Sequence, residues 1–336
     1  MASDTASMFR HTDNDGPPTH PLGLRAVIAH EIATHGTTCD LNHLDISKMT
    51  SLDAVFSNMD FNGDISKWDT SRIVSMNRVF QGSSFTGDIS DWDVSNAKSM
   101  ASMFEHSAFT GDISRWDTSC VHIMDRLFKN SSFAGDISDW NVSNTKSMVS
   151  MFEGSVFNGD LSTWNMRGVA YLEDMFKDSR FVGNISQWRL QEAVQCGGMF
   201  LGSPFAGDLS SWQLPHWTMV GNMFSPNFAG ILPRPTAKNM RSSYNDMMGS
   251  DNSLTAYLLR MPLNAVHIDL IRDCQESQCP GWLNEIDFEW LQNQKALLND
   301  LGCTQEQQRL ILMDAIDQRG QATLALPSDA LSGLDR

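Results

Sequence analysis

The sequence lacks the features of a membrane protein or a conventionally secreted protein. It contains no run of 18 consecutive apolar residues, which excludes a transmembrane helix. The first residues, from Met1 to Phe9, contain no basic segment and no apolar segment, so a conventional signal peptide is not expected. We therefore expect a cytoplasmic protein, or one that is exported by a route without such a peptide.

Basic residues are also scarce. The chain has 24 Lys and Arg against 40 Asp and Glu, which gives a net charge of −16, and no Lys/Arg run occurs. Nucleic acids and anionic membrane surfaces are polyanions and would repel such a chain. We expect a protein partner, preferably with a basic surface, and neither nucleic-acid binding nor membrane insertion. The sequence specifies no oligomeric state.

Cysteines are few and do not form a metal-binding or redox pattern. The sequence has no C-x-x-C pair, which argues against zinc-ribbon and thioredoxin-like sites. Free, mostly buried thiols are therefore expected, although Cys274 and Cys279 are close enough in sequence to pair in an oxidising compartment. The six cysteines are Cys39, Cys120, Cys196, Cys274, Cys279 and Cys303.

One segment, His30-Glu31-Ile32-Ala33-Thr34-His35, resembles a zinc-protease motif. That motif needs two histidines at positions i and i+4, so that both lie on one face of a helix. Here the second histidine is at i+5, which places it on a different face. We expect no zinc at this segment, and no other metal or cofactor is expected.

The dominant feature of the sequence is a repeat of 24 residues. The hexapeptide from Gly87 to Trp92 returns in seven copies, without insertions, between Gly63 and Trp212. A fixed period of this length indicates stacked units, none of which can bury its apolar face alone. Two series of phenylalanines keep the same step: Phe56, Phe80, Phe104, Phe128, Phe152, Phe176, Phe200 and Phe224, and Phe61, Phe85, Phe109, Phe133, Phe157, Phe181 and Phe205.

The unit from residue 76 to residue 99 predicts the structure of one coil. Its apolar residues Met76, Val79 and Phe80 have helical spacing, Gln81-Gly82-Ser83 interrupts the helix, and the segment from Phe85 to Ser90 is expected to be extended. The recurring glycine, Gly87 in this unit, should permit a positive φ or the close passage of a neighbouring chain. The fold class predicted is an α/β solenoid of 24-residue coils with short parallel strands and short helices, similar in length to leucine-rich repeats.

Two further series should form ladders along the stack. Carboxylates stacked about 4.8 Å apart repel one another unless backbone N–H groups or bound cations satisfy them. Asn184 keeps the acceptor oxygen without the charge, which favours turn capping over a calcium ladder, and no EF-hand pattern is present. The ladders are Asp64, Asp88, Asp112, Asp136, Asp160, Asn184 and Asp208, and Trp68, Trp92, Trp116, Trp140, Trp164, Trp188 and Trp212.

The pattern Met-x-x-Met-Phe-x-x-Ser-x-Phe-x-Gly-Asp-Ile-Ser-x-Trp-Asp-Val-Ser-Asn, carried with local variation by residues 100–120 and 148–166, resembles the BspA-like leucine-rich repeats. More narrowly it is similar to the subfamily first collected from mycoplasma surface lipoproteins. The resemblance covers roughly residues 22–232 and includes a cap-like lead-in at residues 24–28 and 39–43. It implies a right-handed solenoid that binds proteins or cell surfaces, and it implies no catalytic residues.

The composition divides the chain into five parts. Residues 1–20 are polar and are predicted to be a disordered leader, and residues 21–49 form a cap whose helix spans 22–35 and ends at Gly36. The repeat occupies residues 50–239. Residues 240–320 read as a small all-α domain with helices over 286–298 and from Thr304 onward, and residues 321–336 are a flexible tail.

These observations favour a non-enzymatic recognition protein whose partner contacts positions that differ between copies. The candidate binding face is Lys67, Asp91, Arg115, Asp139, Thr163 and Gln187, beside the tryptophans, and a second varying row is Asn62, Thr86, Thr110, Ala134, Asn158 and Val182.

Two alternatives remain open at this stage. One is a secreted bacterial effector whose helical C-terminal domain acts on or docks to a host protein that the repeats select. Bacterial ubiquitin ligases that carry leucine-rich repeats use a Cys-x-Asp motif, which none of Cys274, Cys279 and Cys303 provides, so no catalytic residue is assigned. The other alternative is a structural subunit of a phage or secretion particle.

Overall fold

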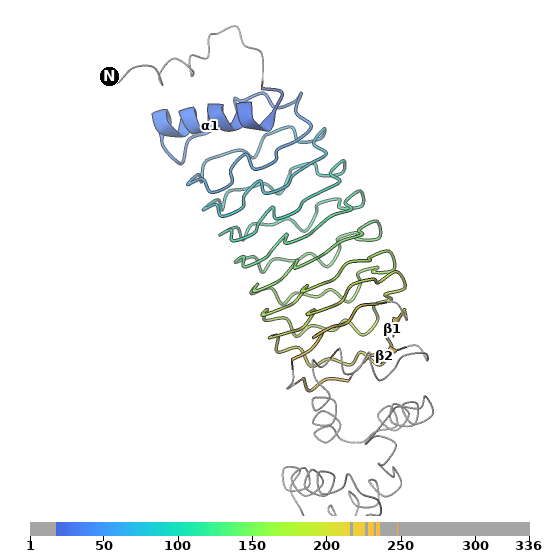
Figure 1. Cartoon of the computed structure of the whole chain (residues 1–336). Helices are drawn as coiled ribbons and strands as arrows, with labels where there is room; N and C mark the ends of the chain where they lie inside the picture. The colour runs from blue at the N-terminus through green and yellow to red at the C-terminus, as the bar shows by residue number, and fades with distance from the viewer. Residues whose placement is uncertain (1–17, 216–217, 226–227, 232, 236–246, 248–336) are drawn as a thin grey trace, which may run out of the picture.

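The computed structural model describes residues 18–215, 218–225, 228–231, 233–235 and 247. These residues build an elongated stack of coils with one helix, α1 (Pro21–His35), lying across its N-terminal end (Figure 1). The two strands, β1 (Gln213–Leu214) and β2 (Arg234–Pro235), pair in parallel near the other end, with Gln213 opposite Arg234 and Leu214 opposite Pro235. Among the described residues no helix is long and apolar enough to cross a membrane.

Helix α1 confirms the helix expected at residues 22–35. Pro21 occupies the first turn, where a missing N–H costs nothing, and the Nδ1 atom of His20 accepts a hydrogen bond from the Leu22 N–H at 3.3 Å. Gly36 ends the helix with a φ of 91° and donates its N–H to the carbonyl of Ile32. Leu24 and Ile28 are fully buried, so the helix covers the apolar interior of the first coil.

Arg25 of α1 completes the N-terminal cap. In each later coil, the N–H groups of the preceding coil donate to backbone carbonyls; for example, Phe56 donates to Val79 at 3.0 Å and Asn58 to Gln81 at 2.7 Å. The first coil has no such neighbour. The Arg25 guanidinium takes its place and donates to the carbonyls of Ala54 at 2.6 Å, Val55 at 3.2 Å and Ser57 at 2.8 Å.

The segment predicted as a short helix in each coil is a pair of tight turns, so the prediction of helices within the coils is wrong. Met76, Arg78, Phe80 and Gly82 donate their N–H groups to carbonyls of the next coil at 2.8–2.9 Å, whereas helical bonds would stay within the segment. Arg78 has a φ of 57° and Gly82 a φ of 63°, and both values interrupt a right-handed helix.

Left-handed backbone recurs at these two positions along the stack. Residues with positive φ at the first position are Ala54, Arg78, Ser102, Arg126, Ser150, Asp174, Gly198 and Asn222, and at the second Asn58, Gly82, His106, Asn130, Gly154, Asp178 and Gly202. A non-glycine residue in this region carries a steric cost. The hydrogen bonds to the next coil offset it, because they satisfy N–H groups that would otherwise be buried without a partner.

Parallel pairing between coils is present, but mostly as single bridges rather than the expected short strands. Ser75, Ser99, Ile123, Ser147, Tyr171, Gln195 and Met219 are bridged in succession, one residue per coil. The segment expected to be extended, from Phe85 to Ser90, forms no strand. At its start the Thr86 N–H donates to the side-chain oxygen of Asn62 at 2.8 Å instead of to a backbone carbonyl, which breaks the ladder.

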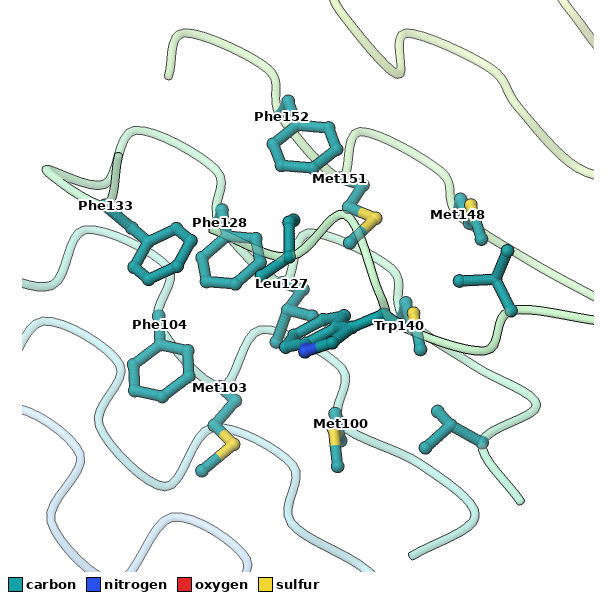
Figure 2. Close-up of a cluster of buried hydrophobic side chains, with 14 of the residues drawn as sticks. Met100, Met103, Phe104, Leu127, Phe128, Phe133, Trp140, Met148, Met151 and Phe152 are labelled. Atoms are coloured by element: carbon teal, nitrogen blue, oxygen red, sulfur yellow. The ribbon is translucent and has the colours of Figure 1, made fainter. Parts of the chain in front are cut away.

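The core consists of aromatic residues stacked along the axis of the coils (Figure 2). Neighbouring rings in the first phenylalanine series, such as Phe104 and Phe128, lie 5.5–5.8 Å apart and nearly parallel. Within a coil, the two phenylalanines are closer, at 4.4 Å for Phe128 and Phe133. Methionines such as Met103 and Met151 fill the space beside the rings, so each coil adds one layer to a continuous core.

The recurring glycines from Gly63 to Gly207 do not adopt the positive φ that the sequence suggested, and they have another role. A Cβ atom at Gly111 would lie 2.7 Å from the ring of Phe109, two residues earlier in the same coil, and the same contact recurs in the other copies. The glycine therefore leaves room for the phenylalanine to turn into the core. At Gly63 a Cβ would also meet the carbonyl oxygen of Cys39, which agrees with the expected close passage of a neighbouring chain.

The regular step shortens at the C-terminal end of the stack. Phe205 stacks on Phe228, and Asp208 bridges to Ile231, both at a step of 23 residues. Beyond them, the carbonyl of the buried Met247 accepts the Phe224 N–H at 3.0 Å, as the carbonyl of Met223 accepts the Phe200 N–H at 2.8 Å. A residue inside the predicted domain 240–320 thus contacts the stack.

The rest of residues 240–320, the leader up to residue 17 and the tail 321–336 lie outside the described residues. The prediction that the stack is a right-handed solenoid of the leucine-rich-repeat type stays a prediction.

Candidate interaction surfaces

The recurring Asp residues cap a tight turn in each coil. The Oδ1 atom of Asp88 accepts the N–H of Ser90 at 2.9 Å. Every other member of this ladder makes the same bond to the serine two residues later, at 2.8–3.0 Å, and Asn184 does so without a charge. The hydrogen bonding therefore matches the turn-capping interpretation.

These hydrogen bonds outweigh the repulsion between stacked carboxylates. The backbone N–H of Ser90, followed by its hydroxyl, lowers the pKa of Asp88, whereas burial and the carboxylates of Asp112 and Asp64 raise it by less. Asp136 behaves in the same way, with Ser138 as the donor. In the part of the chain that the structure describes, no three His, Cys, Asp or Glu residues are grouped so that they could hold a metal ion.

A second series of turns, which the sequence interpretation missed, runs beside the first. The Oδ1 atoms of Asp69, Asp93 and Asp117 accept the N–H groups of the serines two residues later at 3.0–3.1 Å. Asn141 makes the equivalent bond to Ser143 at 3.1 Å. The signal was present in the sequence as Asp/Asn-x-Ser at a step of 24, directly after the first four tryptophans of the ladder, Trp68, Trp92, Trp116 and Trp140.

The tryptophan ladder joins each coil to the one before it. The indole N–H of Trp140 donates to the carbonyl of Ile113 at 3.0 Å, and all seven tryptophans repeat this bond across 27 residues at 2.9–3.2 Å. Each ring is at most 5% exposed. The tryptophans are therefore structural, and the residue before each of them is the one that reaches the surface.

Those preceding residues form the candidate binding face, which we name the Trp-side row: Lys67, Asp91, Arg115, Asp139, Thr163 and Gln187. All six are exposed. Arg115 and Asp91 form an ion pair at 3.2 Å, but both side chains are more than 70% exposed, so the pair contributes little stability. The row is a mixed-charge surface whose residues differ from coil to coil. The second varying row, from Asn62 to Val182, is also exposed.

A third surface follows the single bridges between coils, and the sequence interpretation did not identify it. We name Ser75, Ser99, Ile123, Ser147, Tyr171, Gln195 and Met219 the bridge row. Its large apolar members, Ile123, Tyr171 and Met219, are 39%, 42% and 54% exposed. The sequence could have indicated this surface, because its three large apolar residues are 48 residues apart and each directly precedes a buried core residue.

A family model described as "Mycoplasma protein of unknown function, DUF285" matches residues 29–133 and 105–212. The two matches together extend over 184 of the 336 residues, from 29 to 212, which is more than half of the chain. The chain belongs to the DUF285 family. This confirms the mycoplasma repeat family named from the sequence, while the broader assignment to BspA-like leucine-rich repeats stays a prediction. Comparisons with curated proteins and with solved structures gave no match.

A polar column of the DUF285 stack consists of residues that directly follow the first phenylalanine series. The Gln81 amide donates to Glu105 at 2.8 Å, and the Lys129 ammonium pairs with Glu153 at 2.7 Å, each across one coil. Burial raises the pKa of Glu153. The hydrogen bonds from Lys129 and Ser150, together with the charge of Lys129, lower this pKa by more than burial raises it, so the net shift is downward. These partly buried groups satisfy one another's hydrogen bonds and join neighbouring coils of the stack.

Burial raises the pKa of two described thiols of this DUF285 chain, those of Cys39 and Cys196. Cys39, Cys120 and Cys196 are free thiols, and burial raises the pKa of Cys196 to about 12, which disfavours a reactive thiolate. Cys274, Cys279 and Cys303 lie outside the described residues. Glu31 pairs with His35 at 3.1 Å and lies 4.0 Å from His43, so the carboxylate joins the end of α1 to the following loop.

Proposed function

We propose that this protein is a non-enzymatic recognition scaffold that binds a partner protein through the surface of its repeats. The observation that carries the proposal is the division between inward and outward residues. The phenylalanines and tryptophans of successive coils are the same residues in the same contacts. The Trp-side row next to the tryptophans is exposed and its residues vary between coils, and the bridge row exposes Ile123, Tyr171 and Met219 where other coils have serine or glutamine.

Such a stack can present its surface in a preformed arrangement. Backbone bonds such as that from Phe80 to Met103 and the bridges between coils fix the positions of neighbouring rows. A preformed surface loses less conformational entropy on association than a flexible one. The proposed scaffold therefore needs no rearrangement to bind, and specificity depends on which side chains each row displays.

The bridge row supports partner binding better than the Trp-side row does. Tyrosine and methionine are enriched in the centres of protein interfaces, whereas Lys and Asp are depleted there. Tyr171 and Met219 lie in the bridge row, while Lys67, Asp91 and Asp139 lie in the Trp-side row. We assign the partner's main contact to the bridge row and a charge-steering role to the Trp-side row.

A quantitative capture experiment tests this proposal. The full chain, cross-linked in lysate of the cells that make it, is compared with a triple variant, Ile123→Ser, Tyr171→Ser and Met219→Ser. A matched control replaces Lys67, Asp91 and Arg115 with Ala. Thermal unfolding followed by tryptophan fluorescence verifies that each variant is folded.

We expect the bridge-row variant to lose a specific protein that the wild type retains. The control should retain that protein, because its three substitutions lie outside the bridge row. Capture of no specific protein by the wild type, or capture that neither triple variant affects, would refute the proposal.

A further inference from the structure

The bridge row has a regular spacing that restricts what can bind along it. Its neighbouring members are joined by parallel bridges, so they are about 4.8 Å apart along the stack. The exposed apolar residues Ile123, Tyr171 and Met219 occupy every second place, with Ser147 and Gln195 between them. The apolar side chains therefore recur at about 10 Å, with the half-buried Ser147 and Gln195 between them.

This interval matches an α-helix and does not match an extended strand. Residues seven apart in a helix are about 10.5 Å apart along its axis and lie nearly on one face. Residues on one face of a strand recur at about 6.7 Å, so a strand laid along the row would lose register after its first contact. A helix of about 14 residues covers the distance from Ile123 to Met219, which is four coils.

The charges beside the row differ on its two sides. Lys98, His122 and Lys146 directly precede members of the row and are exposed. On the other side, two residues after Tyr171, lies the exposed carboxylate of Glu173, whereas Asp125, two residues after Ile123, is half-buried and accepts hydrogen bonds from Ser147 and Val149. A helix that fits this surface carries acidic residues along one flank of its apolar stripe and basic residues along the other flank.

We infer that the bridge row is the docking site for an amphipathic α-helix of a partner protein, whose apolar residues at seven-residue intervals lie over Ser147 and Gln195, between the side chains of Ile123, Tyr171 and Met219. This inference rests on the proposed recognition function and specifies the class of partner. The helix lies along the stack and packs its apolar face on the side chains of Ile123, Tyr171 and Met219.

A selection from designed libraries tests the inference with defined probes. One library displays 21-residue helices in which the positions of one face are randomised, and a second displays extended peptides of equal length. Both are selected against the full chain. The affinities of enriched synthetic peptides are then measured by fluorescence anisotropy for the wild type and for Tyr171→Ser, Ile123→Ser and Ser147→Trp. Val182→Ser serves as the control, because Val182 is 55% exposed and lies outside the bridge row.

The inference predicts enriched helices with apolar residues seven apart, at least tenfold weaker binding to Tyr171→Ser and Ser147→Trp, weaker binding to Ile123→Ser, and unchanged binding to Val182→Ser. The affected variants should keep the far-ultraviolet circular dichroism and the cooperative thermal unfolding of the wild type, which shows that they are folded. Enrichment of extended peptides, helices without this spacing, or sensitivity to Val182→Ser alone would overturn it. A dimer of the chain that Tyr171→Ser dissociates would place a second copy on the row and also overturn it. If the helices fail while the triple bridge-row variant still loses a captured protein, the recognition function stands and only the partner class is wrong.

Discussion

Replacing Arg25 with Ala should weaken the N-terminal end of the stack more than any other single surface substitution. The guanidinium makes three hydrogen bonds of 2.6–3.2 Å to the carbonyls of Ala54, Val55 and Ser57. Val55 and Ser57 are the positions whose carbonyls accept bonds from a preceding coil elsewhere in the stack. Alanine at position 25 leaves these carbonyls without a donor, because the first coil has no predecessor.

The magnitude follows from the number of bonds and their partial burial. A hydrogen bond to a charged group contributes about 1.5–3 kcal/mol, but water can reach a half-buried chain end and replaces part of each bond. We therefore expect a loss of about 2–4 kcal/mol. At roughly 2–4 °C per kcal/mol for a folded unit of this size, the melting temperature should fall by about 4–16 °C. Because repeat stacks open from their ends, the effect should concentrate in the first coil.

Hydrogen exchange measured by mass spectrometry, combined with thermal unfolding, tests this prediction. The amides of Leu52, Ala54, Phe56 and Asn58, which donate to the second coil, should exchange faster in Arg25→Ala, whereas those of Met148 and Phe152 should not change. Arg25→Lys should be intermediate, because an ammonium cannot span three carbonyls. Arg72→Ala, at an exposed arginine, is the matched control. A melting temperature within 1 °C of the wild type, with unchanged exchange in the first coil, would show that the capping argument is wrong.

Three further substitutions test the interior and the turns. Gly111→Ala should destabilise the protein by about 1–3 kcal/mol in urea unfolding, because the added Cβ would lie 2.7 Å from the ring of Phe109. Gly23→Ala in α1 is the control and should be neutral or stabilising, because no atom lies within 4 Å of the Cβ that it adds. Equal effects of the two substitutions would contradict the proposed role of Gly111. Trp140→Phe removes the indole donor to Ile113 and should cost about 1–3 kcal/mol in the same assay; an unchanged urea midpoint would argue against the tryptophan ladder. The Ser90 N–H lowers the pKa of Asp88, so this carboxylate stabilises the fold above the unfolded value of about 3.9, and its contribution disappears as pH falls through the lower folded value. Asp88→Asn, which keeps the acceptor as Asn184 does, should therefore show a flatter acid-unfolding curve than the wild type, and a curve that remains as steep would count against the turn-capping role.

The period of the repeat and the identity of its inward residues could be read from the sequence because they depend on position alone. Phe104, Phe128 and Trp140 recur at the same step, and a residue that recurs in every coil of a stack meets its own copies. The turn-capping role of Asp88 was also accessible, since Asn184 showed that the acceptor oxygen matters more than the charge. Helix α1 was predictable from its apolar spacing and from Gly36.

The structure within each coil could not be derived from spacing. Met76, Val79 and Phe80 point to one side in a helix, and they do so equally in two successive tight turns. The left-handed residue between them is Arg78 in one coil and Ser102 in the next, neither of which favours a positive φ. Only the hydrogen bonds to the neighbouring coil stabilise that conformation, and those bonds are between residues 23 apart in sequence.

The surfaces were the least predictable part. The Trp-side row was identified from its variation, but the bridge row depends on which residue of each coil faces outward beside the single bridges. Ile123 and Tyr171 directly precede buried core residues, so in the sequence they look like part of the core. Arg25 gave no signal of its capping role, because its partners are backbone carbonyls about 30 residues away.

Distances between spin labels along the Trp-side row test the central claim, which is that each 24-residue unit adds one layer to a stack. Nitroxides linked through a non-natural ketone amino acid, which leaves the six cysteines untouched, are placed at position 67 together with 163, 187 or 211, each of which precedes a tryptophan. The pairs span four, five and six coils, so double electron–electron resonance should give mean distances between the labels of about 19, 24 and 29 Å, rising by about 4.8 Å per coil. Separations that do not rise with the number of coils would contradict the stacked arrangement on which the proposed recognition surface depends.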